Sequence, residues 1–214
     1  MGIENIAENI NKLKIPQNVT LIAVSKKKPV EFIEEAYNSG HRDFGENYIQ
    51  DAIPKIKNLK HLKDIKWHFI GHLQSNKAKT AIQYFDMIQS VDSKKLAKKI
   101  DEACAEINKK IHVLIEVNIG SEENKSGIPK ENLVELLDFI ASLNNIKLMG
   151  LMCIPPFDEN PIPYFKEMKN IYNEYKQKYK LTTLSMGMSN DYEIAIENGA
   201  NMVRVGTKIF GKRI

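Results

Sequence analysis

The feature that most constrains the fold is a regular alternation of short apolar segments with longer amphipathic ones along the chain of 214 residues. The amphipathic segments carry apolar residues three to four positions apart, which is typical of helices packed on one face. Several short segments are apolar at consecutive positions, as parallel strands covered on both faces must be. The predicted strands span residues 21–26, 42–47, 66–71, 86–92, 112–118, 147–154, 183–188 and 202–207.

Eight rounds of strand and helix predict an α/β fold, a single closed (β/α)8 TIM barrel. A doubly wound open sheet is the alternative, because it is built from the same alternation. No shift in composition, glycine- or serine-rich linker or internal repeat divides the chain. Residues 1–214 are therefore expected to form one domain.

Residues that favour helix termini stand at the predicted boundaries. Pro29 follows the first strand at a helix start, and Gly40 and Gly199 follow two helices. Ser93 and Ser189 stand where N-caps are expected, since a serine hydroxyl accepts hydrogen bonds from the first backbone N–H groups of a helix. These positions support the predicted order of elements.

The composition excludes several classes of protein. With 43% hydrophobic and 27% charged residues, the chain is an ordinary globular protein. Its 31 basic and 27 acidic residues are interspersed, so the net charge of +4 indicates no nucleic-acid partner. No apolar run is long enough for a membrane span or a signal peptide. Two cysteines, Cys104 and Cys153, are too few for a disulfide framework, and the cytoplasm is the expected compartment.

In a (β/α)8 barrel, chemistry takes place where strands end and the following loops begin. At the first such end, Lys26 directly continues the apolar run, whereas Lys27 and Lys28 already belong to the loop. A lysine becomes a nucleophile toward carbonyl groups when burial or a neighbouring cation lowers its pKa. Lys26 is therefore a candidate reactive amine at the barrel mouth, and a solvated loop lysine is the alternative.

The last two loops have the character of a phosphate site. Gly206 and Thr207 end the eighth predicted strand, where a glycine lets the backbone approach a ligand and where N–H groups and a hydroxyl can donate. Ser189, in the preceding loop, is placed to cap a helix, to bind an anion, or both. Barrels of this type often bind phosphate with the loops after strands seven and eight. The sequence therefore predicts phosphate binding at these loops.

Arg204 is unusual within the eighth predicted strand. It alternates onto the same face as Gly206, toward the barrel mouth, where a buried guanidinium needs a partner. It is predicted either to pair with Glu46 or Glu116, or to donate to a ring nitrogen or phosphate of a ligand.

Other reactive side chains give weaker indications. His68 and His72 flank the third predicted strand without the cysteine or carboxylate neighbours of a metal site, so no metal is predicted. Cys153 ends the sixth predicted strand and is placed at the barrel mouth, where nothing nearby activates it. No catalytic residue is assigned from these patterns.

Seven segments occur together, in order, across nearly the whole chain. Together they closely resemble the pyridoxal phosphate homeostasis proteins, the YggS/PROSC family, which is similar to the N-terminal barrel domain of alanine racemase and to fold type III of the pyridoxal phosphate (PLP) proteins. The segments are AVSKKKP (23–29), DFGENYIQ (43–50), WHFIGHLQSNK (67–77), VNIGSEENKSGI (117–128), GLMCIPP (150–156), LSMGMSND (184–191) and RVGTKIFG (204–211).

The resemblance implies a cofactor, pyridoxal 5′-phosphate, and a function in vitamin B6 homeostasis. Lys26 would hold PLP as a Schiff base, and the protein would buffer PLP or deliver it to apo-enzymes. The position after the reactive lysine is often uncharged in relatives but is Lys27 here. The other cofactor-binding residues implied are Asn47 in the pocket wall, Ser189, Gly206 and Thr207 at the phosphate, and Arg204 near the pyridine ring or the phosphate.

The resemblance also implies a carrier rather than an enzyme. Racemases of this fold type add a β-rich domain and a tyrosine from the other subunit as second acid/base, and a chain ending at Ile214 is expected to lack both. Losing a positioned acid/base typically costs about 10²–10⁴ in rate. An arginine at the ring nitrogen is a permanent donor, so it would leave that nitrogen unprotonated and weaken the ring as an electron sink.

The expected protein is a monomeric or weakly associating carrier of PLP. Two alternatives remain: a slow amino-acid racemase or lyase, and a barrel that binds phosphorylated sugars through a lysine imine, as aldolases do.

Overall fold

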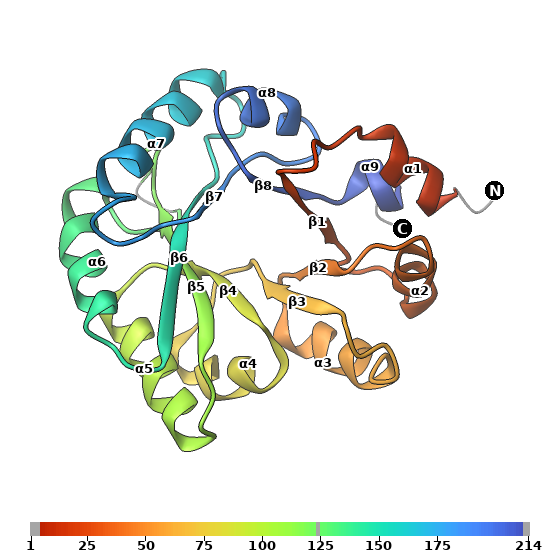
Figure 1. Ribbon diagram of the computed structural model, residues 1–214, viewed down its shortest axis with the longest axis horizontal. Helices are drawn as coiled ribbons and strands as arrows, with labels where there is room; N and C mark the ends of the chain where they lie inside the picture. The colour runs from red at the N-terminus through yellow and green to blue at the C-terminus, as the bar shows by residue number, and fades with distance from the viewer. Residues whose placement is uncertain (1–4, 123–124, 212–214) are drawn as a thin grey trace.

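Eight parallel strands form a closed barrel in the order of the sequence, and helices surround it (Figure 1). The computed structural model describes residues 5–122 and 125–211. Closure confirms the predicted barrel and excludes the open sheet, and each strand overlaps its predicted segment. The strands are β1 (Thr20–Val24), β2 (Asp43–Glu46), β3 (Lys66–Phe69), β4 (Met87–Val91), β5 (Ile111–Val117), β6 (Ile146–Cys153), β7 (Thr183–Ser185) and β8 (Met202–Val205).

A helix follows each strand, and one more precedes the barrel. None of the helices within the described ranges is both long and apolar enough to cross a membrane. The helices are α1 (Ile6–Lys12), α2 (Val30–Asn38), α3 (Ile49–Asn58), α4 (Ala78–Tyr84), α5 (Lys94–Glu106), α6 (Leu133–Ala141), α7 (Ile162–Tyr175), α8 (Tyr192–Glu197) and α9 (Thr207–Phe210), with 3₁₀ turns η1 (Ser75–Lys77) and η2 (Lys130–Asn132) before α4 and α6.

The helix ends agree with the sequence at all but one of the predicted positions. Pro29 is the N-cap residue of α2, and the Ser93 hydroxyl accepts a hydrogen bond from the N–H of Leu96 at the start of α5. Gly40 and Gly199 follow α2 and α8 with φ of +97° and +94°, a region that glycine enters without steric cost.

The prediction that Ser189 caps a helix is wrong. Asp191 is the N-cap residue of α8, and the Ser189 hydroxyl instead accepts a hydrogen bond from the N–H of Gly206. The chain makes one more turn before α8 starts, and this places Ser189 beside the end of β8.

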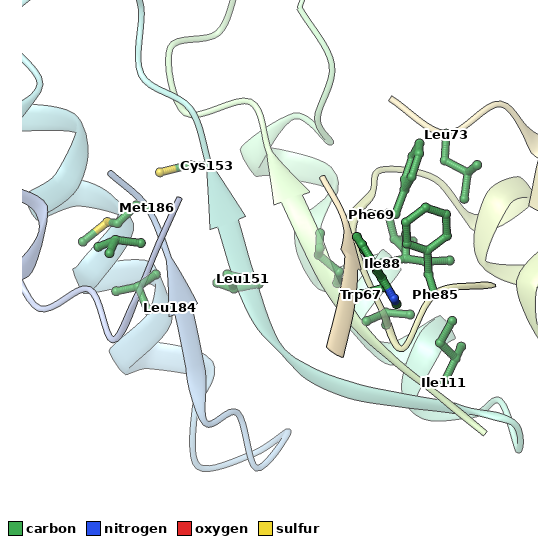
Figure 2. Packing of buried hydrophobic residues seen from close by; sticks show 14 of the residues in the cluster. Trp67, Phe69, Leu73, Phe85, Ile88, Ile111, Leu151, Cys153, Leu184 and Met186 are labelled. Carbon is green, nitrogen blue, oxygen red and sulfur yellow. The ribbon is translucent and has the colours of Figure 1, made fainter. Parts of the chain in front are cut away.

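Side chains on the strands alternate between two apolar layers. The larger layer lies between the sheet and the helices and includes Trp67, Phe69 and Phe85 (Figure 2). The smaller one fills the barrel lumen with Ile22, Met87, Leu114, Met152 and Met202. Polar groups, including Arg204, Glu116 and Gln89, are also buried on the strands.

Cys153 belongs to the outer layer and not to the barrel mouth. Its neighbour Met152 faces the lumen, so alternation along β6 turns the Cys153 side chain outward, among buried apolar residues (Figure 2). Burial raises the pKa of this thiol to about 12. The expectation that Cys153 is exposed at the mouth is therefore wrong. Cys104 and Cys153 are both buried free thiols.

Replacing Gly150 with alanine should destabilise the barrel strongly. A Cβ at this position of β6 would lie 1.7 Å from the carbonyl oxygen of Thr183, so β6 and β7 would have to move apart. We expect a loss of more than about 3 kcal/mol in the free energy of unfolding, measured by urea denaturation.

The matched control is Gly40→Ala. A Cβ there meets no atom within 4 Å, and the substitution carries only the strain of a positive φ. It should cost about 1 kcal/mol. Equal losses in the two variants would contradict the steric explanation.

Candidate functional site

One cavity of about 460 Å³ is bordered by loops at the carboxyl ends of the strands. Its volume lies in the range typical of sites for small molecules. All six residues singled out in the sequence as a possible ligand site line this cavity. They come from the ends of four strands: Lys26 after β1, Asn47 after β2, Ser189 after β7, and Arg204, Gly206 and Thr207 on and after β8.

The three consecutive lysines after β1 have different surroundings. Lys26 is half-buried and lines the cavity. Lys27 is exposed and adopts a positive φ of +58° in the turn. Lys28 is buried, with its amine 5.9 Å from the centre of the Phe32 ring. The turn that separates them thus presents Lys26 to the cavity, which the run of three lysines alone did not decide.

A buried ion pair holds the backbone just before Lys26. The Lys55 amine lies 2.8 Å from Glu46 Oε1 and donates to the carbonyl of Ser25 at 2.8 Å. The Ser25 hydroxyl donates to the same Glu46 oxygen at 2.7 Å. Burial raises the pKa of Glu46, and the charge of Lys55 opposes this shift. Lys55 was not predicted from the sequence, since nothing in a helical segment marks which lysine folds back onto a strand.

Polar groups from the last two loops meet at the end of β8. The N–H of Gly206 donates to the Ser189 hydroxyl at 3.2 Å, and α9 begins at Thr207. The first N–H groups of a helix have no partner within the helix, so this corner offers donors to an anion. The buried Oδ1 of Asn47 has no hydrogen-bond partner among the described residues. A buried acceptor without a partner in a cavity wall fits a ligand that donates to it.

Arg204 is buried at the cavity and makes two hydrogen bonds within the barrel. One goes to the Ser185 hydroxyl at 2.6 Å and the other to the carbonyl of Cys153 at 3.0 Å. Burial lowers the pKa of Arg204, and nearby Glu116 counteracts this. The predicted pair with Glu46 is wrong, because Glu46 binds Lys55. Glu116 acts on Arg204 through its charge, and no direct ion pair joins these two among the described residues.

Glu116 is the most perturbed carboxyl group near the cavity. Burial and the neighbouring charge of Asp92 raise its pKa to about 7, although the positive charge of Arg204 lowers it. The protonation state of this carboxyl therefore changes near neutral pH, beside the buried guanidinium.

The apolar side of the cavity comes from the loop after β6, which sequence reasoning did not assign to the site. Ile154, Pro155 and Pro156 line the cavity, and Phe157 at its edge is 83% exposed. The GLMCIPP segment carried the signal, because it runs directly from a strand end into these residues. Two carboxylates, Glu159 and Asp191, also lie in the wall.

The two histidines of the third strand have separate partners. His68 Nε2 lies 3.0 Å from an Asp43 oxygen, whereas His72 Nδ1 lies 3.7 Å from an Asp92 oxygen. In the described part of the chain, no group of three histidine, cysteine, aspartate or glutamate side chains is arranged to hold a metal ion.

Comparisons with known proteins agree with this architecture. The family model described as "Alanine racemase, N-terminal domain" matches residues 2–213. A pyridoxal phosphate homeostasis protein from Aquifex aeolicus is 46% identical over 198 residues, which make up 90% of this chain and 86% of that protein. An alanine racemase from Clostridium difficile, with a TM-score of 0.77 and 18% identity over 97% of this chain and 56% of its own, shares the fold.

The structures of PipY from Synechococcus elongatus are more similar. The structure without PLP has a TM-score of 0.93 and 39% identity, covering 96% of this chain and 100% of that one. The structure of PipY with PLP bound has a TM-score of 0.90 and 38% identity at the same coverage.

Replacing Glu116 with glutamine should change how stability depends on pH. The folded-state pKa of about 7 lies above the ordinary value of 4.5, so the unfolded state loses this proton first as pH rises. The wild type should therefore lose about 2–3 kcal/mol relative to Glu116→Gln between about pH 4.5 and pH 7. Urea denaturation across this range measures the difference. Glu31→Gln, at an exposed position of α2, is the control, and identical profiles for wild type and Glu116→Gln would contradict the assignment.

Proposed function

The chain belongs to the pyridoxal phosphate homeostasis protein family, whose barrel is that of the alanine racemase N-terminal domain, and on this premise we propose that it binds PLP reversibly at Lys26. The proposal rests on one observation: Lys26 lines the same cavity as Ser189, Gly206 and Thr207. A ligand that carries both an aldehyde and a phosphate needs an amine that can react with the aldehyde and hydrogen-bond donors that can bind the phosphate.

The residues present fit each part of such a cofactor. Ser189 and the N–H groups at the start of α9 would hold the phosphate. The apolar wall of Ile154, Pro155 and Pro156 suits a flat aromatic ring. The buried Oδ1 of Asn47, which lacks a partner in the described part of the chain, would accept a hydrogen bond from a ring substituent.

Lys26 would act as the attachment point. When bound, PLP supplies an aldehyde carbon that condenses with a primary amine to form a Schiff base, with release of one water molecule. Lys26 is half-buried on the cavity side of its turn, so its amine would meet the aldehyde there. Because the condensation is reversible, water or another amine can release the cofactor, and this allows Lys26 to buffer PLP and pass it to apo-enzymes.

Arg204 favours storage of the cofactor over its use in catalysis. A guanidinium remains protonated and only donates hydrogen bonds. Facing the ring nitrogen, it would leave that nitrogen without a proton, and an unprotonated ring stabilises a carbanion poorly. We propose that the protein acts in the cytoplasm as a monomeric carrier, with PLP and apo-enzymes as its partners and without a nucleic acid, a membrane or a metal.

The cavity offers few groups for a racemase. Removal and return of a proton on both faces of a substrate need two positioned acid/base groups, and Lys26 supplies one. Among the described residues the cavity wall contains no tyrosine or histidine, and its carboxylates are Glu159 and Asp191. The Glu159 carboxylate accepts a hydrogen bond from Tyr164, and Asp191 accepts one from the N–H of Met188. Both are already engaged in structural contacts.

Replacing Lys26 with alanine should abolish covalent attachment of PLP. After incubation with PLP and reduction with borohydride, peptide mass mapping of the wild type should show a pyridoxyl group on Lys26. The Lys26→Ala variant should lose both this adduct and the visible absorbance of the Schiff base, while weak phosphate-dependent binding persists. Lys27→Ala is the matched control and should behave as wild type, because Lys27 is exposed outside the cavity. An adduct on Lys27 or Lys28 would refute the assignment.

Proton exchange at amino acids should be slow in the PLP-loaded protein. Incubation with alanine in deuterated water, followed by mass spectrometry, measures incorporation of deuterium at the α-carbon. We expect a rate at least about 10²-fold below that of an enzyme with two positioned acid/base groups. Incorporation at the rate of an efficient racemase would show that the chain is an enzyme.

A further inference from the structure

A continuous chain of hydrogen bonds runs from the cavity through the barrel lumen to the amino ends of the strands. Arg204 Nη1 donates to Ser185 Oγ at 2.6 Å, and Ser185 Oγ donates to Gln89 Oε1 at 2.7 Å. Gln89 Nε2 lies 3.3 Å from His68 Nδ1, and His68 Nε2 lies 3.0 Å from Asp43 Oδ1. Five strands contribute one residue each, and only Arg204 lines the cavity.

This series of hydrogen bonds crosses the barrel lumen, where water has little access. Ser185 on β7 reaches Gln89 on β4, which is three strands away around the closed barrel. Arg204, Ser185, Gln89 and His68 are all at most 4% exposed. Buried polar groups must find hydrogen-bond partners within the protein. The orientation of each side chain in the series therefore depends on the side chains to which it is hydrogen-bonded.

The direction of every hydrogen bond follows from Arg204. A guanidinium can only donate, so Ser185 Oγ accepts from it and uses its own proton toward Gln89 Oε1. The Gln89 amide group then faces His68 with its NH₂, and His68 Nδ1 must accept. The ring proton of His68 is consequently on Nε2, where it can be donated to Asp43.

The charge on Asp43 agrees with this direction. Burial alone would raise the pKa of Asp43, but other interactions, led by its hydrogen bond with His68, outweigh burial, and the net pKa lies below the usual range. An ionised carboxylate is an acceptor and suits the Nε2–H of His68. Three other titratable side chains interact electrostatically with His68 or with its partner Asp43: His41, Lys66 and His112.

We propose that Ser185, Gln89 and His68 are positioning residues that couple the orientation of Arg204 in the cavity to the tautomer of His68 on the other side of the barrel. If Arg204 turns away, Ser185 Oγ loses its donor and becomes able to accept from the amide group of Gln89 instead. That reversal turns Gln89 Oε1 toward His68 and favours a ring proton on Nδ1. The effect on PLP binding rests on the proposed function, whereas the tautomer is a property of the protein alone.

The first test is the tautomer of His68 in the PLP-free protein, read from ¹⁵N NMR of the imidazole. The wild type should carry its proton on Nε2 with an unprotonated Nδ1. In Ser185→Ala, Arg204 no longer orients Gln89, and a population with Nδ1 protonated should emerge. In Gln89→Glu, a carboxylate accepts from both Ser185 and His68, so His68 should be protonated at Nδ1.

Ser90→Ala is the matched control. Ser90 is also buried on β4, next to Gln89, but its hydroxyl has no hydrogen-bond partner among the described residues. This variant should leave the His68 tautomer as in wild type. A wild-type proton on Nδ1, or an unchanged tautomer in both Ser185→Ala and Gln89→Glu, would overturn the proposal.

The second test is PLP affinity, measured by fluorescence or absorbance titration. Ser185→Ala should weaken binding about 10- to 150-fold, as expected for loss of a hydrogen bond to a charged group, and Ser90→Ala should bind as wild type. If Ser185→Ala changed the His68 tautomer but left the affinity for PLP unaltered, the claim that these hydrogen bonds position Arg204 for the cofactor would be overturned. If the wild type failed to bind PLP, the proposed function would fall, while the NMR experiment would still decide whether the hydrogen bonds are coupled.

Discussion

The pairing of β1 with β8 is the constraint on which the site depends. Ile22 lies beside Arg204 and Ala23 beside Val205, so the first and last strands close the barrel (Figure 1). The closure brings the loop that carries Lys26 next to the loops at the carboxyl end of the chain. A further contact, from the Asn9 side chain to the carbonyl of Ile209, joins α1 to α9 on the same side. Without this closure, Lys26 and the phosphate-binding loops proposed after β7 and β8 would lie at opposite edges of an open sheet.

Some polar groups are buried in the barrel lumen beside the small apolar cluster, and others lie between the strands and the helices. Burying a charge is costly unless it is paired or hydrogen-bonded, and removing one partner of such a pair leaves the other uncompensated. Two arrangements meet this cost: the Glu46–Lys55 pair behind Lys26, and the hydrogen bonds of Arg204 with Ser185 and the Cys153 carbonyl. Each fixes the backbone or side chain next to the cavity, so the groups that would contact a ligand are held by the packed barrel.

Under the proposed function, a carrier and an enzyme can share this fold because the fold would supply the attachment point and the phosphate site, whereas turnover needs additional groups. The cavity presents one amine, a permanently charged arginine and an apolar wall. Such a set binds an aldehyde and a phosphate well. The described wall contains no tyrosine or histidine as a second acid/base, and under the proposed function an arginine at the ring nitrogen would disfavour a carbanion. In the proposed function, the residues that would hold a reactive aldehyde would also limit its reactions.

The sequence by itself determined the order of strands and helices, the barrel and the loops at which chemistry was expected, because apolar periodicity and terminal residues such as Pro29 and Ser93 act locally. It also pointed to the six residues that share the cavity, because each stands at or near a strand end and lies in a segment that resembles the family. Only the tertiary structure decided that Glu46 binds Lys55 and not Arg204, that Ser189 meets Gly206 instead of capping α8, and that Cys153 faces outward. These outcomes depend on turn geometry and on contacts between residues far apart in the chain, and local patterns carry no information about either.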